Sequence, residues 1–418
     1  MNIVVFLNEL GAGGTEKAAV TWALHLKQKG HRISVLALKG GPRETLLRQH
    51  EIPVQLVNAD PDAIREILFA LTPDIIHAHV PGYPHMGDVL GLALRDLPIP
   101  VVQTNIFGRL ENRAEAAWTG LRLFISWTSC IQAAERAHTP LDRAFFQSHS
   151  VTPYPVHPIS PSSPDEILAF RTKLGIQPQH VLYGRIARPD VNKWDSAIFP
   201  AFIQARKANP NLRLLLREPP VAFSHWFAHA ILRNNCVILP LTSDEQELRT
   251  TIASLDVVLN ISPIGESFGY SIAEGMALSK PVIANITPWQ DMAQVELVRQ
   301  GETGFLTGTV SSLADAMRML GMDALIRERL GKAGQLRILG LANAQESGDR
   351  VEQILLAATQ SRPNPFAEQD LVFAQQAAAN LYAQKWGLCN KDHVALRIRS
   401  AYHGARSILS RFLHGVFL

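Results

Sequence analysis

The sequence predicts an α/β protein with two parallel-sheet domains. Short apolar strands alternate with amphipathic helical patterns from the first residue onward, which is typical of parallel sheets covered by helices. The chain has 418 residues, which is more than one average domain. Residues 152–164 contain five prolines and divide the strand–helix series in two. Because such a composition continues neither a sheet nor a helix, we interpret this stretch as an interdomain linker.

The first domain is expected over residues 1–157. A glycine-rich turn at residues 11–14 separates its first strand from a helix over residues 15–29, which Gly30 ends. Apolar runs predict its strands at residues 2–7, 33–38, 54–57, 74–79, 101–104 and 123–126.

The second domain is expected over residues 165–342. Ser243 with Gln246, and Ser312 with Asp315, have the spacing of capping boxes and are expected to start two of its helices. Apolar runs predict its strands at residues 181–183, 212–216, 237–239, 257–261, 282–284 and 304–306.

The last part of the chain is expected to be helical. Helical patterns fill residues 324–339 and 343–356, and a break at residues 361–369 follows them. We assign residues 343–390 to C-terminal helices outside the second sheet.

Residues 393–418 form a basic, amphipathic pattern. No acidic residue follows Asp392, whereas Arg397, Arg399, Arg406 and Arg411 do, and apolar residues recur at spacings of three and four. This pattern predicts either a helix on an anionic membrane surface or a helix whose apolar face docks on protein.

Composition excludes several classes of protein. A formal net charge of +3 does not indicate a nucleic-acid-binding protein. Cys130, Cys236 and Cys389 are far apart, so they predict neither a metal site nor a disulfide framework and suit a reducing compartment. No stretch has the length and apolarity of a membrane span, and the first residues lack the pattern of a signal peptide. We expect a cytoplasmic protein, either soluble or peripheral on the inner face of the cell membrane.

The glycine turn after the first strand is a candidate anion site. Gly13 and Gly14 let the backbone approach a ligand, and the N-terminus of the following helix favours negative charge. A purely structural tight turn explains the same residues. The turn is not the Gly-x-Gly-x-x-Gly dinucleotide pattern.

Two cations in the second domain are candidates for binding a diphosphate. Arg185 ends a predicted strand and Lys193 follows eight residues later. Strand ends of an open sheet face the ligand crevice, where a bidentate arginine and a lysine suit two linked phosphates. The alternative is that both are solvated surface residues.

The stretch 256–284 carries the strongest signal. A buried strand leads through a polar, glycine-bearing loop into a helix expected at residues 268–278. Glu266 in the loop can accept hydrogen bonds from sugar hydroxyls, and Glu274 on the helix can accept from both hydroxyls of a ribose. The backbone N–H groups of Phe268, Gly269 and Tyr270 can hold a phosphate. Alternatively, the two glutamates act as a helix-start acid and a salt-bridged surface residue.

Four motifs together resemble the retaining glycosyltransferases of family 4. They are GGTE at residues 13–16, DIIHAH at 74–79, GRIARPDVNK at 184–193 and ESFGYSIAE at 266–274. The resemblance implies the GT-B fold, in which two Rossmann-like, doubly wound parallel-sheet domains face each other across a cleft. It also implies that a nucleotide-sugar binds mainly to the second domain, as a substrate and without a resident cofactor or metal. Residues 343–390 would then supply helices that cross back to the first domain.

The resemblance assigns roles to the matched residues. Arg185 and Lys193 would neutralise the departing diphosphate, Glu266 would bind the donor sugar and Glu274 the ribose. Gly14 would approach the phosphates from the opposite domain. The family transfers with retention and without a covalent enzyme intermediate, so we name no nucleophile.

The sequence departs from the family pattern at two places. Many relatives carry a histidine where Asn105 follows a predicted strand, so Asn105 is our candidate for contacting the donor sugar, with His79 or His85 as substitutes. A histidine at a strand end is also often structural. Ser279-Lys280 replaces a glycine that is common in relatives, which we interpret as a difference in turn chemistry.

One motif favours a rival fold. Asp60-Pro61-Asp62 follows an apolar strand, and an Asp-x-Asp at this place holds a divalent metal in GT-A glycosyltransferases. Both aspartates also suit the start of the helical pattern at residues 63–71.

We therefore expect a retaining, metal-independent glycosyltransferase. It would move a hexose from a UDP- or GDP-sugar to a glycan or lipid-linked acceptor in cell-surface polysaccharide or glycolipid synthesis. The alternatives are a sugar phosphorylase or a nucleotide-sugar epimerase on the same scaffold, or a non-catalytic protein that binds sugar nucleotides.

Overall fold

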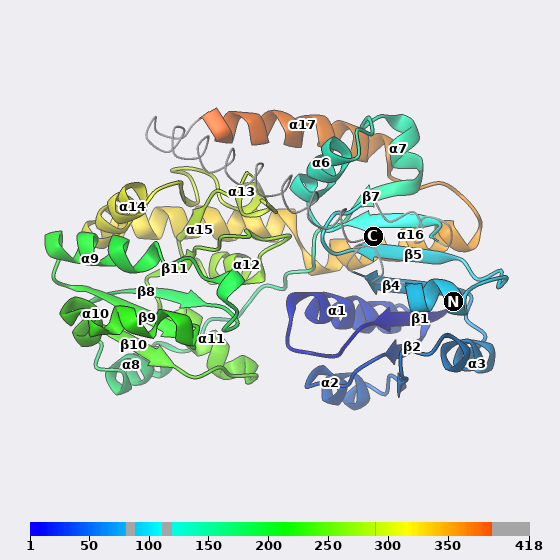
Figure 1. The fold of residues 1–418 in the computed structure, drawn as a ribbon, viewed down its shortest axis with the longest axis horizontal. Helices are drawn as coiled ribbons and strands as arrows, with labels where there is room; N and C mark the ends of the chain where they lie inside the picture. Colours follow the sequence, from blue (N-terminus) through cyan, green and yellow to red (C-terminus); the bar gives the residue numbers. More distant parts are fainter. Residues whose placement is uncertain (81–87, 111–118, 289, 387–418) are drawn as a thin grey trace, which may run out of the picture. The chain divides into compact units, whose positions relative to one another are not determined.

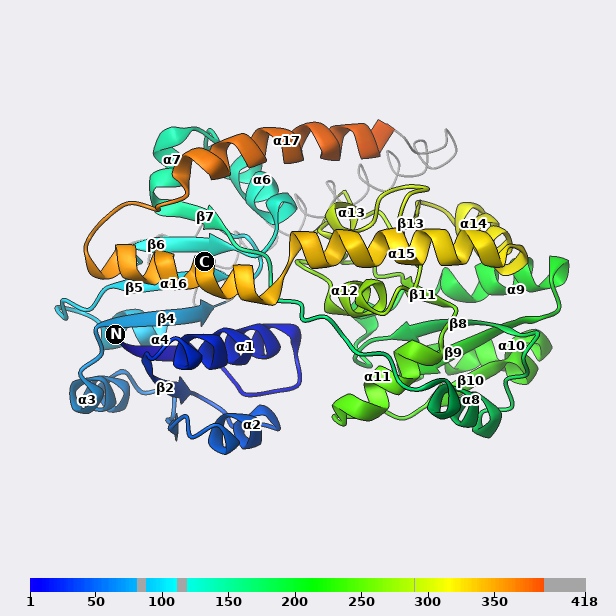
Figure 2. The same cartoon turned by 180° about the vertical axis from the view of Figure 1, so that it is seen from behind.

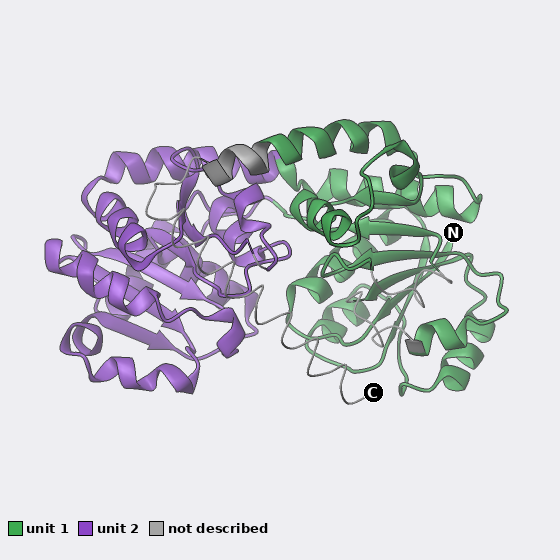
Figure 3. Ribbon diagram, turned by 45° about the horizontal axis from the view of Figure 1, so that its top comes forward, with its two compact units in different colours: residues 1–157, 341–379 green, residues 158–340, 380–418 purple. Residues whose placement is uncertain are grey.

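The chain forms two compact units. A computed structural model describes residues 1–80, 88–110, 119–288 and 290–386. The first unit joins Met1–His157 to Leu341–Ala379, and the second contains Pro158–Gly340 (Figure 3). Each unit is built on one parallel sheet whose strand order reverses part-way, so the predicted α/β class of two Rossmann-like sheets is confirmed. The basic segment 393–418 lies outside the described residues.

The sheet of the first unit runs in the order β3-β2-β1-β4-β5-β6-β7, with all neighbours parallel (Figure 1). All residues of β1 and β4 are buried, as expected for strands covered by helices on both faces. The strands are β1 (Asn2–Leu7), β2 (Arg32–Ala37), β3 (Val54–Leu56), β4 (Ile75–Val80), β5 (Val101–Asn105), β6 (Leu121–Phe124) and β7 (His149–Val151). The helices are α1 (Gly14–Gln28), α2 (Arg43–Gln49), α3 (Pro61–Leu71), α4 (Asp88–Ala93), α6 (Trp127–Arg136), α7 (Arg143–Ser148), α16 (Ala344–Thr359) and α17 (Ala367–Trp386).

The sheet of the second unit runs in the order β10-β9-β8-β11-β12-β13 and is also parallel. Its strands are β8 (Val181–Ile186), β9 (Leu212–Arg217), β10 (Cys236–Leu239), β11 (Val257–Asn260), β12 (Val282–Asn285) and β13 (Gly304–Thr307). Its α-helices are α8 (Pro164–Lys173), α9 (Ile198–Ala208), α10 (Ala230–Asn235), α11 (Glu245–Ser254), α12 (Tyr270–Ala277), α13 (Gln294–Leu297), α14 (Val310–Met322) and α15 (Ala324–Leu341). Two 3₁₀ helices, η1 (Val191–Lys193) and η2 (Val221–Ala228), complete it.

The strand order creates one switch point in each sheet, where successive connections leave in opposite directions. It lies between β1 and β4 in the first unit and between β8 and β11 in the second. In open α/β sheets, ligands bind beyond the carboxyl ends of the strands at such a point.

Several predicted boundaries were wrong. The sixth strand covers Leu121–Phe124 rather than residues 123–126, because Ser126 caps α6 with its side chain on the Ser129 N–H. Strand β7 was missed. It is three residues long and begins with His149 and Ser150, so it lacks an apolar run.

Both predicted capping boxes were also wrong. The side chain of Asp244, rather than Ser243, caps α11 and accepts hydrogen bonds from the N–H groups of Gln246 and Glu247. A capping box does start α14, but Thr309 is its cap and Ser312 is its third helical residue. In each case a neighbouring polar side chain competes for the same backbone groups.

The proline-rich stretch is only partly an open linker. Tyr154 and Val156 are buried, and Val156 exchanges backbone hydrogen bonds with Ala342 and Ala344 within the first unit. Beyond His157 the chain enters the second unit, where Ser163 and Glu166 form a capping box at the start of α8.

Helices α16 and α17 complete the first unit. Helix α16 lies beside α1, as Figure 2 shows, and Trp22 donates from its indole N–H to Ser347 Oγ at 2.9 Å. Asp370 on α17 is fully buried, pairs with Arg350 on α16, and accepts from Ser150 Oγ on β7 at 2.8 Å. These polar contacts join α16 to α1 and α17 to the sheet of the first unit. No helix in the described part of the chain is long and apolar enough to cross a bilayer.

Candidate active site

The switch point of the second sheet gathers the predicted cations. Arg185 is the fifth residue of β8, where it pairs in register with Leu259 of β11. Lys193 ends η1, whose first turn is capped by Asp190. Arg185 Nη2 donates to the backbone oxygen of Lys193 at 2.6 Å and so anchors the segment that carries the lysine.

Arg185 is a buried cation that donates hydrogen bonds to the backbone oxygens of Ile186 and Lys193. Its side chain is 1% exposed, its Nε has no hydrogen-bond partner in the described residues, and its guanidinium carbon lies 5.6 Å from the centre of the Trp194 ring. Burial lowers the pKa of Arg185 to about 10, and nearby Glu266 opposes that shift. The guanidinium therefore stays charged at neutral pH and favours an anion in its surroundings.

Glu266 lies beside these cations. Its Oε2 accepts from Lys193 Nζ at 3.0 Å, and its Oε1 accepts from Asn260 Nδ2 at 3.2 Å. Burial raises the pKa of the Glu266 carboxyl, but Lys193, Arg185 and the hydrogen bonds outweigh burial and leave that pKa below its ordinary value. Arg185, Lys193 and Glu266 thus form one charged group, as the sequence predicted, and the predicted alternative of solvated surface cations is wrong for Arg185.

The loop that carries Glu266 is held tightly. Gly265 has φ +64°, and a Cβ there would lie 1.8 Å from the backbone oxygen of Asp291, so only glycine fits. Gln294 Oε1 accepts from the backbone N–H of Glu266 at 3.0 Å, and the Ala293 N–H donates to the backbone oxygen of Glu266 at 2.8 Å.

Helix α12 begins directly after this loop. Gly269 caps it with φ +96°, and Phe268 is buried against the Tyr270 ring, whose centre lies 5.3 Å from its own. The helix starts at Tyr270, two residues later than predicted. Glu274 is half-buried in its second turn. At the end of α12, Ser279 has φ +56°, a left-handed conformation that favours glycine and is consistent with the turn interpretation.

The remaining predicted residues lie at the carboxyl edge of the first sheet. Gly13 caps α1 and Gly14 is its first residue. His79 is buried near the end of β4, where its ring centre lies 4.3 Å from that of His77 and 5.7 Å from that of Trp22, and neither nitrogen of its ring has a hydrogen-bond partner in the described residues. Burial, and secondarily His77, hold its pKa well below the ordinary value.

Asn105 has a structural task. Its Oδ1 accepts from the Arg109 N–H at 3.0 Å, and its Nδ2 donates to the Arg109 oxygen. A sugar hydroxyl would therefore compete with the loop 105–109 for this amide. His85 lies outside the described residues.

Asp60, the first residue of the rival metal motif, caps a helix. It accepts from the Asp62 N–H at 3.0 Å and starts α3, which confirms the helix-start alternative.

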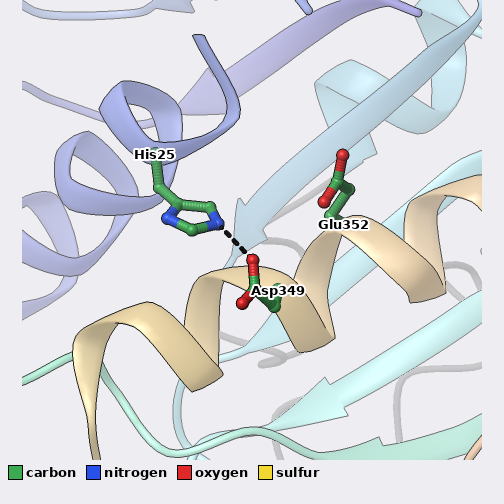
Figure 4. A group of neighbouring side chains, drawn as sticks. All are labelled: His25, Asp349 and Glu352. Atoms are coloured by element: carbon green, nitrogen blue, oxygen red, sulfur yellow. Dashed lines mark hydrogen bonds and ion pairs between the residues drawn. The ribbon is translucent and has the colours of Figure 1, made fainter. Parts of the chain in front are cut away.

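One group of three metal-ligand side chains exists among the described residues. His25 on α1 and Asp349 and Glu352 on α16 each place one ligand atom within 4.8 Å of the others (Figure 4). Asp349 already pairs with His25 at 3.0 Å and Lys29 at 2.7 Å, and Glu352 pairs with His31 at 2.7 Å. The three side chains therefore lie close together because they form ion pairs and hydrogen bonds between α16 and residues 25–31.

Two family models match the chain, one in each unit. Residues 12–131 match Glycosyltransferase Family 4, and residues 178–323 match Glycosyl transferases group 1. No curated protein matches the sequence.

Solved glycosyltransferase structures have the same fold. Anabaena Alr3699/HepE, crystallised with UDP-glucose, is 20% identical with a TM-score of 0.71, and the match covers 85% of this chain and 99% of that one. A glycosyltransferase from Rickettsia africae ESF-5 is 16% identical with a TM-score of 0.70, covering 85% and 98%. WaaG, a glycosyltransferase involved in lipopolysaccharide biosynthesis, is 12% identical with a TM-score of 0.64, covering 84% and 99%. The family matches and the shared fold show that this chain is a glycosyltransferase of the GT-B type. Its first unit carries the Glycosyltransferase Family 4 region and its second unit the Glycosyl transferases group 1 region.

Proposed function

We propose that this protein is a retaining, metal-independent glycosyltransferase that moves a hexose from a UDP- or GDP-sugar to a glycan or lipid-linked acceptor. One observation carries the proposal. Arg185, buried and bonded to backbone oxygens, and Lys193 stand beside Glu266 at the switch point of the second sheet. A site with two cations and one carboxylate has a net positive charge, which suits the diphosphate of a nucleotide-sugar.

We propose that this site catalyses the reaction by electrostatic stabilisation of the leaving group. As the glycosidic bond to the diphosphate breaks, negative charge develops on the leaving phosphate oxygen. Arg185 and Lys193 stabilise that charge. Glu266 accepts from hydroxyls of the donor sugar, and Glu274 accepts from the ribose. The diphosphate leaves with the bonding electron pair and takes up the proton of the acceptor hydroxyl. The acceptor oxygen bonds to the anomeric carbon from the same face, and no side chain forms a covalent intermediate.

The relatives support the donor and the acceptor classes. Alr3699/HepE binds UDP and UDP-glucose in its crystals, and WaaG takes part in lipopolysaccharide biosynthesis. By analogy we propose a UDP- or GDP-sugar donor and a place in cell-surface polysaccharide or glycolipid synthesis. We also propose that residues 393–418 bind anionic lipid on the inner face of the membrane, since clustered arginines gain about 1 kcal/mol each near such a surface. A truncation at residue 392 that binds anionic liposomes as the full chain does would refute this second point.

Turnover of a donor panel tests the proposal. UDP-, GDP- and ADP-hexoses are incubated with the full chain and candidate acceptors, and NMR reads the anomeric configuration of the product. We expect transfer with retention, unchanged by a chelator, and its loss in Glu274→Ala but not in Glu302→Ala, which changes an exposed glutamate of the same unit. Dependence on manganese, turnover that requires phosphate, donor conversion without acceptor, or tight binding without turnover would each contradict it.

A further inference from the structure

Lys193 has two tasks that compete. Its Nζ donates to Glu266 Oε2 at 3.0 Å and approaches the Gly265 oxygen at 3.4 Å. The proposed function, on which this inference rests, requires the same ammonium to contact the donor diphosphate. When Lys193 turns to the diphosphate, Glu266 loses its nearest cation. A carboxylate without other partners would then change rotamer and leave the donor sugar.

The carboxylate has a second anchor in Asn260. This residue ends β11 and is 1% exposed, and its Nδ2 donates to Glu266 Oε1 at 3.2 Å and to Ser271 Oγ at 2.9 Å. The Asn260 amide has no net charge, so a bound diphosphate that it does not contact would not draw it away from Glu266. The contact between Asn260 and Glu266 therefore persists when the diphosphate binds.

The backbone of Glu266 is anchored by Gln294. Gln294 is fully buried, and its Oε1 accepts from the Glu266 N–H at 3.0 Å. Its Nε2 donates to the Asn285 oxygen at 3.0 Å and to Thr287 Oγ1 at 2.8 Å, so β12 and the connection after it fix its amide. The Gln294 side chain thus links the Glu266 loop through its Oε1 to β12 and the following connection through its Nε2.

We infer that Asn260 and Gln294 are positioning residues that keep Glu266 directed at the donor sugar after Lys193 moves to the diphosphate. Neither residue belongs to the motifs that identify the site. Both act on the sugar end of the donor and leave its diphosphate end to Arg185 and Lys193.

Two variants and one matched control test this inference. Asn260→Ala removes the carboxylate anchor and Gln294→Met removes the backbone anchor. Gln300→Ala is the control, because Gln300 Oε1 also accepts from a backbone N–H, that of Leu306 at 2.6 Å, away from the loop. Calorimetry measures the Kd of UDP and GDP, and turnover of the preferred donor gives kcat. NMR of glutamate carboxyl carbons measures the pKa of Glu266.

We expect kcat to fall about tenfold in each test variant, the loss of one hydrogen bond in the transition state. The Kd of the nucleoside diphosphate should stay within about twofold, and the Gln300 variant should keep both values. A general loss of structure would instead weaken diphosphate binding as much as turnover. Unchanged kcat, or a parallel loss of kcat and diphosphate affinity, overturns the inference.

The titration separates this inference from the proposed function. If the unmodified protein neither binds nor turns over any nucleotide-sugar, the proposed function fails. The anchoring of Glu266 is then decided by its pKa, which should rise in Asn260→Ala because a donor to the charged carboxylate is lost. A pKa that does not change in this variant overturns the inference in either case.

Discussion

Gly265 provides a sharp test of how the Glu266 loop is built. A Cβ at this position would lie 1.8 Å from the Asp291 oxygen and 2.4 Å from Thr287 Oγ1. The residue also has φ +64°, a conformation that costs an L-residue about 1–2 kcal/mol. Overpacking adds about 1–3 kcal/mol, so Gly265→Ala should lower the free energy of unfolding by about 2–5 kcal/mol.

Gly301 separates the two contributions. It has φ +73° and lies in the same unit, but a Cβ there would meet no atom within 4 Å. Gly301→Ala should therefore lose only the conformational part, about 1–2 kcal/mol. Urea denaturation measures both variants, and donor turnover should fall only in Gly265→Ala because the methyl group displaces Glu266. Equal losses of stability, or full turnover in Gly265→Ala, would refute the close contact with residue 291.

Two further predictions concern the first unit. Asp370→Ala leaves the largely buried Arg350 without its carboxylate, so urea denaturation should show a loss of about 3–5 kcal/mol in the free energy of unfolding. Glu368→Ala, in an exposed pair on the same helix, should lose less than about 1 kcal/mol. Equal effects would contradict the buried pair. Burial lowers the pKa of His77 to about 3 and holds that of His79 far below its ordinary value. The unfolded chain therefore binds more protons below pH 6.5, and stability should fall as the pH drops below that value, by about 1.4 kcal/mol per pH unit for each histidine. His79→Leu should reduce the slope of stability against pH by the contribution of one histidine, about 1.4 kcal/mol per pH unit. An unchanged slope would count against a neutral, buried His79.

The strands and the charged site could be predicted because their signals are local. Apolar runs mark β1, β8 and β11. Arg185 lies near the end of β8, and Lys193 and the glutamates follow β8 and β11, which end at the same edge of the sheet. The order of the strands therefore predicts that Arg185, Lys193 and Glu266 lie close together.

The anchoring residues could not be predicted in the same way. Gln294 follows Glu266 by 28 residues and begins a helix of four residues, so no periodic pattern leads to it. Asn260 is a polar residue inside an apolar run, and such a residue signals an unusual environment without naming its partner. The two hydrogen bonds between the Asn105 side chain and the Arg109 backbone likewise depend on loop geometry, which a single sequence does not determine.

Calorimetry of a nucleoside diphosphate tests the central claim most directly. The claim is that Arg185 and Lys193 bind the diphosphate of the donor at the second switch point. The Kd of the preferred nucleoside diphosphate should rise about 10- to 100-fold in Lys193→Ala, the worth of one charge-assisted hydrogen bond, and should not change in Lys207→Ala, which removes an exposed lysine of α9. An unchanged Kd in Lys193→Ala would contradict the claim.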